Sequence, residues 1–152
     1  MTPPRIQPIP AQHTHALRHR VLRPHQPLDE MAYPGDDDPG TIHLGVFTTQ
    51  TQIVGIVSLY HEPISPHAGL PPKPGDWRLR GMAVDTAHQG RGYGKQLVKA
   101  GQLAAQAAGA ARIWCNARTT AAGFYQRLGF RTAGQPFDLP GIGEHNVMWI
   151  AV

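Results

Sequence analysis

The sequence predicts a mixed α/β fold, and three observations support this prediction. Its 152 residues suffice for one domain with its own hydrophobic core. Short apolar runs that are typical of strands alternate with segments whose apolar residues recur at helical spacing. A glycine-rich turn joins one of these strands to an alanine-rich helix. We therefore predict a single α/β domain over residues 1–152.

The amino-acid composition is that of a folded, soluble protein. Hydrophobic residues make up 41% of the chain, well above the range of disordered proteins. The one cysteine, Cys115, cannot form an intrachain disulfide, which favours a reducing compartment. The longest apolar run, residues 53–60, is too short to span a bilayer, and the N-terminus lacks the apolar core of a signal peptide. These features predict a cytoplasmic protein that does not bind membranes.

The first part of the chain predicts a short strand and two helical segments. Residues 11–22 form the clearer helix, because Ala16, Leu17 and Val21 fall on one side of it. Pro24 ends this helix, since proline cannot continue one. The short strand covers residues 6–9, and a further helical turn covers residues 28–33.

An antiparallel strand pair is predicted next. Ile42, Leu44 and Val46 alternate with smaller or polar residues, and residues 53–60 form a nearly continuous apolar run. The segment 63–76 contains five prolines and is predicted to be a loop.

The C-terminal half predicts alternating strands and helices. In the helix at residues 95–108, Leu97, Ala100, Ala104 and Ala107 recur at spacings of three, four and three. The other predicted elements are a strand at 77–84, a turn at 88–94, a strand at 112–116, a helix at 120–128, a short strand at 130–132 and a strand at 147–152.

Positive charge is concentrated between Thr86 and Phe137. This stretch has seven basic residues and no acidic one, which favours an anionic ligand. A nucleic-acid-binding protein more often shows dense Lys/Arg runs or interleaved aromatic residues, so nucleic acid is not the predicted partner. The basic residues are Arg91, Lys95, Lys99, Arg112, Arg118, Arg127 and Arg131.

The alternating glycines Gly90, Gly92 and Gly94 lie where a strand passes into a helix. Glycine permits backbone conformations that point successive amide groups into one concavity, and the helix adds unpaired N–H groups and the positive end of its dipole. Arg91 and Lys95 add positive charge. The pattern predicts a phosphate cradle, and the alternative is a glycine-rich turn without a ligand. Both the nucleotide-triphosphate loop and the dinucleotide loop need other glycine spacings.

Two sequence motifs, which follow one another along the chain, resemble the motifs of a known protein family. Gln89, Gly92 and Gly94 form Q-x-x-G-x-G, and residues 124–130 read F-Y-x-x-x-G-F. Together with the strand before the turn and the strand RIWCNAR, residues 79–130 resemble the GNAT superfamily of acyl-CoA-dependent N-acetyltransferases. The resemblance implies a GNAT-like mixed, mostly antiparallel central sheet with helices on both faces. It also implies that this sheet is splayed in the middle, between the strands at 77–84 and 112–116.

The resemblance further implies that acetyl-CoA is the co-substrate and lies in this opening. Backbone amides of Gly90 to Lys95 would hold its pyrophosphate, and the strand at 82–84 would pair with its pantetheine arm. Arg118 stands where many relatives have Asn, so it either reaches a CoA phosphate or lies in solvent. The cofactor-binding residues implied are Met82, Ala83, Val84, Gln89, Gly90, Arg91, Gly92, Tyr93, Gly94, Lys95, Asn116 and Arg118.

Acetyl transfer to an amine needs a proton donor and a proton acceptor. Tyr125 matches the family tyrosine that protonates the departing thiolate, and the alternative is that it is a core aromatic like Phe124. Because the strand at 77–84 lacks a Glu, His145 is the candidate base, with Glu144 as its competitor. We expect His145 to lie just before the final strand.

Other candidate groups have ordinary structural explanations. Residues 36–38 are three aspartates that could attract a cationic amine, but a solvated loop is the preferred interpretation. His15 and His19 lack a third ligand with suitable spacing, so no metal site is predicted. Cys115 is interpreted as a buried packing residue rather than a nucleophile.

The predicted function is transfer of acetyl from acetyl-CoA directly to a primary amine of a small molecule or peptide. A non-catalytic acyl-CoA-binding module is the alternative, and nucleic-acid binding is a third hypothesis. The sequence does not identify the amine acceptor. Dimers are common in the superfamily, so the resemblance leaves a homodimer open.

Overall fold

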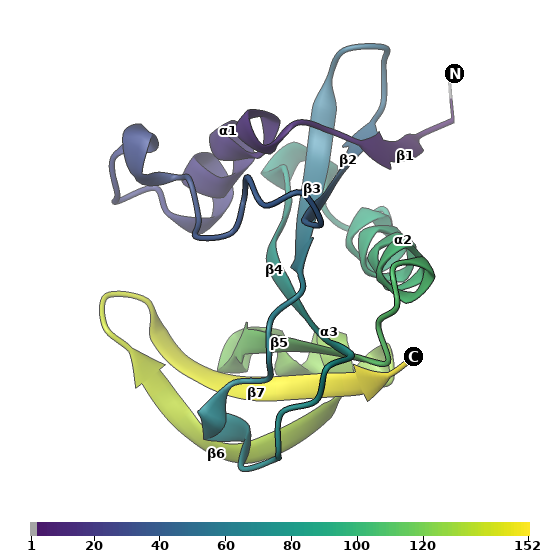
Figure 1. Cartoon of the computed structure of the whole chain (residues 1–152). Helices are drawn as coiled ribbons and strands as arrows, with labels where there is room; N and C mark the ends of the chain where they lie inside the picture. The colour runs from purple at the N-terminus through teal and green to yellow at the C-terminus, as the bar shows by residue number, and fades with distance from the viewer. Residues whose placement is uncertain (1–2) are drawn as a thin grey trace. The chain divides into compact units, whose positions relative to one another are not determined.

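The computed structural model describes residues 3–152 and contains a seven-stranded sheet. The strand order is β1-β2-β3-β4-β5-β7-β6 (Figure 1). The β1–β2, β2–β3, β5–β7 and β6–β7 ladders are antiparallel, whereas the β4–β5 ladder is parallel. The predicted mixed, mostly antiparallel α/β fold is therefore confirmed. The strands are β1 (Arg5–Pro8), β2 (Ile42–Phe47), β3 (Ile53–Tyr60), β4 (Asp76–Val84), β5 (Arg112–Arg118), β6 (Arg131–Leu139) and β7 (Gly143–Ala151).

The chain divides into two compact units. Unit 1 comprises Met1–Tyr60 and Leu79–Ala105, and unit 2 comprises His61–Arg78 and Gln106–Val152. The parallel β4–β5 ladder lies within unit 2 and is short, because it runs only from the pair Asp76↔Arg112 to the pair Arg78↔Trp114. None of the helices among residues 3–152 is long and apolar enough to cross a membrane.

In unit 1, helix α2 (Tyr93–Ala107) packs closely on β3, as Figure 1 shows. An ideal Cβ atom on Gly101 would lie 2.8 Å from Cδ1 of Leu59, so only glycine permits this approach. Of the apolar face predicted for α2, Leu97 is buried, Ala100 and Ala104 are half-buried and Ala107 is exposed, because the helix buries a neighbouring stripe. Alanines on several sides of a helix do not reveal which side packs, whereas a glycine allows close contact without adding hydrophobicity. The buried residues of α2 are Tyr93, Leu97, Val98, Gly101 and Ala105.

The helix predicted at residues 11–22 is a run of three short helical segments. These are η1 (Ala11–Thr14, 3-10), α1 (His15–Leu17) and η2 (Arg18–Leu22, a π-helix). The backbone N–H of Arg23 donates to the carbonyl of Arg18 at 3.0 Å, which is the wider turn of a π-helix. A further 3-10 turn, η3 (Leu28–Glu30), replaces the helical turn predicted at 28–33.

In unit 2, β5, β7 and β6 form a curved antiparallel layer (Figure 1). The strands predicted at 130–132 and 147–152 are too short, since β6 continues to Leu139 and β7 begins at Gly143. The β6–β7 register shifts between Ala133 and Phe137, and this interruption hides the strand pattern in the sequence. Helix α3 (Ala122–Arg127) follows a 3-10 turn, η6 (Thr119–Ala121), within the helix predicted at 120–128.

Within unit 2, Asp76 holds the proline-rich loop that precedes β4. Its carboxylate accepts hydrogen bonds from the backbone N–H groups of Ile64 and Lys73, each at 3.0 Å, and from Nε of Arg112 at 2.7 Å. Burial alone would raise the pKa of Asp76, but Arg112 and the backbone N–H groups of Lys73 and Ile64 together outweigh it, and the pKa is lowered. The loop also contains a 3-10 turn, η4 (Pro66–Ala68), and it ends before Asp76, which opens β4. This loop, residues 63–75, is therefore ordered, and we call it the strap.

Candidate functional site

The glycine turn between β4 and α2 has the backbone that a phosphate cradle needs. Gly90 and Gly92 adopt left-handed conformations, with φ of +80° and +84°. An ideal Cβ atom on either glycine would meet no neighbouring atom within 4 Å, so the surface beside them is open. Gly94 lies inside α2, and the side chains of Arg91 and Lys95 are exposed. The turn thus presents cationic side chains beside the N-terminus of a fifteen-residue helix.

Gln89 is exposed, and its side chain still contacts the backbone at the end of β4. Its Nε2 donates to the carbonyl oxygen of Val84 at 3.0 Å, which ties the turn to the end of β4. The backbone N–H of Asp85 donates to the carbonyl of Val54 at 2.8 Å, and η5 (Thr86–His88) follows. The side chain of Gln89 therefore positions the backbone of the turn.

Met82, Ala83 and Val84 form the last part of β4, directly before this turn. Ala83 is buried, whereas Met82 and Val84 are half-buried. Gly81 precedes them with φ of +66°, a left-handed residue inside a strand. Sequence reasoning missed this position, although a glycine within a strand pattern is a signal of a bulge or a close approach.

In unit 2, Asn116 and Arg118 lie at the end of β5. Asn116 is half-buried, and its Oδ1 atom is buried without a hydrogen-bond partner in the structure. Such an acceptor is uncommon in folded proteins and is satisfied when a donor from a ligand or a water reaches it. Arg118 is exposed and stands opposite His145 in the β5–β7 register.

Tyr125 is buried in α3 between two aromatic rings. The ring centroids of Phe124 and Phe130 lie 5.1 and 5.3 Å from that of Tyr125. Burial, and secondarily Cys115, raise the pKa of the Tyr125 phenol far above its ordinary value. The phenol is therefore protonated at neutral pH and can act as a donor. It cannot act there as a phenolate base.

His145 lies inside β7, so the prediction that it precedes the final strand is wrong. Only 4% of its surface is exposed, and its Nδ1 lies 2.7 Å from the carbonyl oxygen of Gly143. A carbonyl only accepts hydrogen bonds, so Nδ1 must carry a proton. In the neutral ring, Nε2 then holds the lone pair and is the atom that can accept a proton. Glu144 is exposed, and its side chain points to the opposite side of the strand from that of His145.

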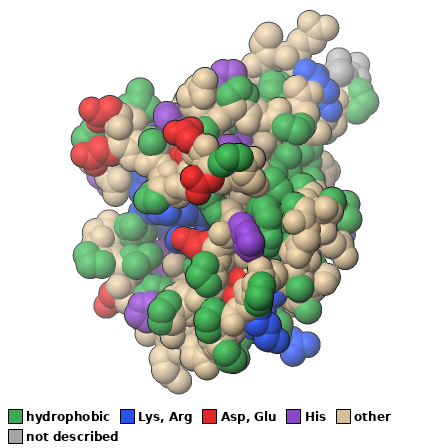
Figure 2. Space-filling view, in the orientation of Figure 1, with side chains coloured by type: hydrophobic (Ala, Val, Ile, Leu, Met, Phe, Trp, Pro, Cys, Tyr) green, Lys and Arg blue, Asp and Glu red, His purple; other side chains and the backbone are tan. Residues whose placement is uncertain are grey.

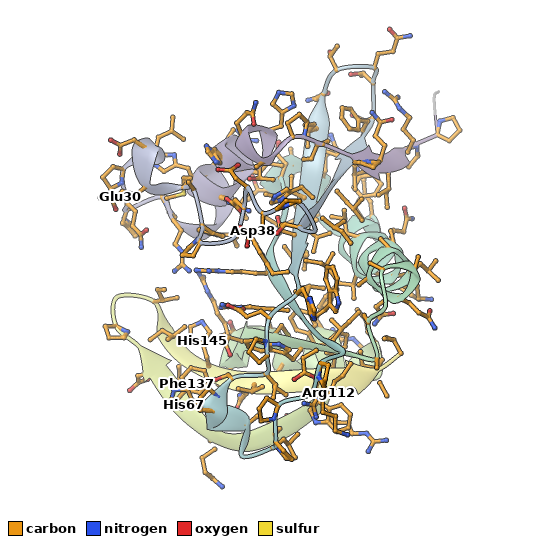
Figure 3. All side chains as sticks on the ribbon, in the orientation of Figure 1. Glu30, Asp38, His67, Arg112, Phe137 and His145 are labelled. Atoms are coloured by element: carbon orange, nitrogen blue, oxygen red, sulfur yellow. The ribbon has the colours of Figure 1, made fainter. Side chains whose placement is uncertain are left out.

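An aromatic stack connects His145 to the strap. Phe137 of β6 stands opposite His145 in the ladder, with ring centroids 6.1 Å apart. His67 of η4 stacks on Phe137 at 4.0 Å with the ring planes 2° apart. Figure 3 shows the three side chains one after another, from β7 through β6 to η4. No pattern in the sequence indicates this contact, because it depends on where the loop folds.

The structure gives Cys115 a packing role. The thiol is buried, and burial raises its pKa to about 12. It is therefore uncharged at neutral pH and a poor nucleophile. Among residues 3–152, no group of three His, Cys, Asp or Glu side chains could hold a metal ion.

Asp36 does not lie in a solvated loop, which corrects the preferred interpretation of residues 36–38. Its carboxylate is buried and contacts the guanidinium of Arg18 at 2.6 and 3.0 Å. Its charge is thus compensated inside unit 1 and does not attract a cationic amine. Asp37 and Asp38 are exposed, and Figure 2 shows acidic side chains on the surface over this part of unit 1.

Comparisons with known proteins agree with the fold. The family described as "Acetyltransferase (GNAT) domain" matches residues 41–132. The "uncharacterized N-acetyltransferase YitI" of Bacillus subtilis (strain 168) is 37% identical over 145 residues, which cover 95% of this chain and 93% of that protein.

Solved structures show the same architecture. A putative N-acetyltransferase from Lactobacillus plantarum has a TM-score of 0.76 at 21% identity, covering 99% of both chains. An aminoglycoside 6'-N-acetyltransferase complexed with coenzyme A has a TM-score of 0.71 at 13% identity, covering 97% of this chain and 96% of that one.

Proposed function

Since this chain belongs to the GNAT acetyltransferase family, we propose that it transfers the acetyl group of acetyl-CoA directly to a primary amine of a small molecule or peptide. The observation that carries the proposal is the turn before α2. Its left-handed Gly90 and Gly92 and its exposed Arg91 and Lys95 suit a pyrophosphate. The coenzyme A complex of a structural neighbour supports the same class of co-substrate.

The family resemblance assigns the remaining contacts of the co-substrate. The backbone of Met82 to Val84 would pair with the pantetheine arm, which leads from the turn back along β4. The unpartnered Oδ1 of Asn116 would accept a hydrogen bond from an amide of this arm. Arg118, which is exposed, would bind a CoA phosphate.

Two side chains of unit 2 would move the protons of the reaction. The neutral amine would attack the carbonyl carbon, and the Nε2 atom of His145 would take the one proton that the nitrogen loses as the amide forms, directly or through water. The neutral phenol of Tyr125 would give one proton to the sulfur as the carbon–sulfur bond breaks. The products are the N-acetylated amine and free CoA, and His145 and Tyr125 return to their starting states by exchange with solvent.

Two measurements test the proposal. Calorimetric titration with acetyl-CoA should show binding, and a panel of amines should release free CoA from it. The panel includes polyamines, aminoglycosides and peptide N-termini, because structural neighbours are named for spermidine, aminoglycoside and ribosomal-protein alanine acetylation. Binding without CoA release with any amine would instead indicate a non-catalytic acyl-CoA-binding module. Absence of binding would overturn the proposal.

We also propose that the protein acts in the cytoplasm as a single domain over residues 1–152. The buried free thiol of Cys115 supports a reducing compartment. Sedimentation of the purified protein would test whether it forms a homodimer.

A further inference from the structure

Arg80 lies on β4 directly before the left-handed Gly81, and its guanidinium lies over the ring of Tyr33. The central carbon of the guanidinium is 4.1 Å from the ring centroid. A cation above an aromatic ring is attracted by the electrons of its face, so this contact orients the arginine side chain. Both side chains are half-buried, which means that solvent reaches part of each. Arg80 is therefore an oriented cation at the surface of unit 1.

The ring of Tyr33 is itself held in place beside β4. The backbone N–H of Tyr33 donates to Oδ2 of the buried Asp36 at 2.8 Å. The guanidinium of Arg18 lies 4.0 Å from the centroid of the same ring. An ideal Cβ atom on Gly81 would lie 3.4 Å from Cε2 of Tyr33, so the ring packs closely against the backbone of β4. The support on which Arg80 rests is therefore fixed by contacts on several sides.

We call Arg18, Tyr33, Asp36 and Arg80 the Tyr33 cluster. Arg18 is fully buried and contacts the carboxylate of Asp36 at 2.6 and 3.0 Å, so these two charges compensate each other. Arg80 brings a second guanidinium to the same ring. At neutral pH the cluster thus carries one net positive charge, which belongs to the half-buried Arg80 rather than to the buried Arg18. A ligand that reaches the cluster from solvent meets a cation.

We propose that the acceptor of the reaction is an amine that carries a carboxylate, and that the guanidinium of Arg80 binds this carboxylate. The inference rests on the proposed function, which places the pyrophosphate at residues 90–95 and the pantetheine arm along residues 84 to 82. The thioester then comes next along β4, toward Gly81 and Arg80. An amine that attacks the thioester there brings the rest of the acceptor to the Tyr33 cluster.

The chemistry of a stacked guanidinium suits a carboxylate. Stacking on Tyr33 uses the flat face of the Arg80 guanidinium, whereas its N–H donors lie in the plane and point outward. Two parallel N–H groups match the two oxygens of a carboxylate, and a side chain that is already oriented loses little entropy when it binds. The single net charge of the cluster also matches one carboxylate. A polyamine or an aminoglycoside carries several positive charges, and the cluster would repel it.

The first test compares acceptors that differ only in the carboxylate. Amino acids and short peptides are assayed for CoA release from acetyl-CoA, each beside its C-terminal amide. The kcat/KM should be roughly 10- to 100-fold higher for the acid, which is the range expected for a hydrogen bond between charged groups. Equal values for acid and amide, or CoA release only with amines that lack a carboxylate, would overturn the inference alone. Absence of CoA release with every amine of the wider panel would overturn the proposed function, and the inference with it.

A matched pair of variants assigns the preference to Arg80. Arg80→Gln removes the charge but keeps a planar polar group over Tyr33, so the preference for the acid should vanish, mainly through a higher KM for the acid. Arg5→Gln is the control, because Arg5 also lies over an aromatic ring of unit 1, that of Phe47 at 5.0 Å, but on β1. This control should keep both the turnover and the preference. An unchanged preference in folded Arg80→Gln would contradict the inference.

A binding measurement on the wild-type chain decides the question if Arg80→Gln does not fold. The full chain is labelled with ¹⁵N in its arginine side chains, saturated with CoA and titrated with the N-acetylated product of the best acid acceptor. This product should shift the Nε–H resonance of Arg80, whereas the amide of the same product should not. Equal Arg80 resonances with the two products would overturn the inference.

Discussion

The Nδ1 atom of His145 donates a hydrogen bond to the carbonyl oxygen of Gly143, two residues earlier in the same strand, at 2.7 Å. This contact selects the tautomer of the ring and leaves Nε2 as the acceptor. A backbone carbonyl thus orients the candidate base, as a third group does in many acid–base sites.

His145→Ala should slow the reaction. If Nε2 accepts the proton, its removal should lower kcat/KM by roughly 10²- to 10⁴-fold. The measurement is the rate of CoA release with one active amine. His67→Ala is the control, because His67 is exposed and contacts His145 only through Phe137. An unchanged rate in His145→Ala would assign the proton transfer to another group.

Tyr125→Phe should lower turnover and leave cofactor affinity nearly unchanged. The substitution removes only the hydroxyl, so the contacts with Phe124 and Phe130 survive. Loss of a general acid costs roughly 10²- to 10⁴-fold, and the loss should appear in kcat because the proton is needed as charge develops on sulfur. Single-turnover rates should be measured, since product release can hide the chemical step. Unchanged rates would identify Tyr125 as a core aromatic.

Gly92→Val should abolish acetyl-CoA binding without unfolding the protein. Gly92 has φ of +84°, which a β-branched residue rarely adopts, whereas an added side chain would meet no atom within 4 Å. The backbone of the cradle should therefore change and the core should not. Calorimetry measures the affinity, and circular dichroism checks the fold. Gly40→Ala is the control, because Gly40 is equally open but has an ordinary φ. Wild-type affinity in Gly92→Val would contradict the proposed pyrophosphate site.

Acid should destabilise the protein through Asp36. Burial alone would raise the pKa of Asp36, but hydrogen bonds from Arg18, Tyr60 and the backbone of Tyr33 outweigh it and lower the pKa to about 2. Because the pKa of Asp36 is lower in the folded state than the value of 3.8 for the unfolded state, the charged carboxylate stabilises the folded state at pH values above 3.8. This stabilisation is lost as the pH falls from 3.8 through about 2. The contribution is about 2 kcal/mol. Denaturant unfolding at several pH values should show this loss in wild type and a weaker one in Asp36→Asn.

Asp76→Asn should loosen the strap and destabilise unit 2. Asp76 is 1% exposed and neutralises Arg112, so the variant leaves a buried cation without its partner and should cost about 3–5 kcal/mol of the free energy of unfolding. Glu62→Gln is the control, since the Glu62–Arg78 pair at 3.2 Å is partly exposed and should contribute about 1 kcal/mol or less. Equal unfolding free energies of the two variants would show that Asp76 does not hold the strap.

Most of the strands and the turn before α2 could be predicted, because their signals are local. An apolar run such as residues 53–60 identifies a strand by itself, and alternating glycines identify a tight turn. The packed face of α2 was mispredicted, because Gly101 contacts Leu59 without any hydrophobic signal of its own. β6 was predicted too short, because Gly134 and Pro136 interrupt its alternation.

The sequence by itself determined which residues are the candidates for the proposed chemistry. Left-handed backbone at Gly90 and Gly92, the phenol at 125 and the imidazole at 145 follow from residue type and local order. Only the tertiary structure decided what surrounds them. Arg18 finds its partners 18, 40 and 42 positions further along the chain, and the strap places His67 on Phe137. Such contacts depend on burial and on the meeting of distant segments, and neither is encoded in any short stretch of sequence.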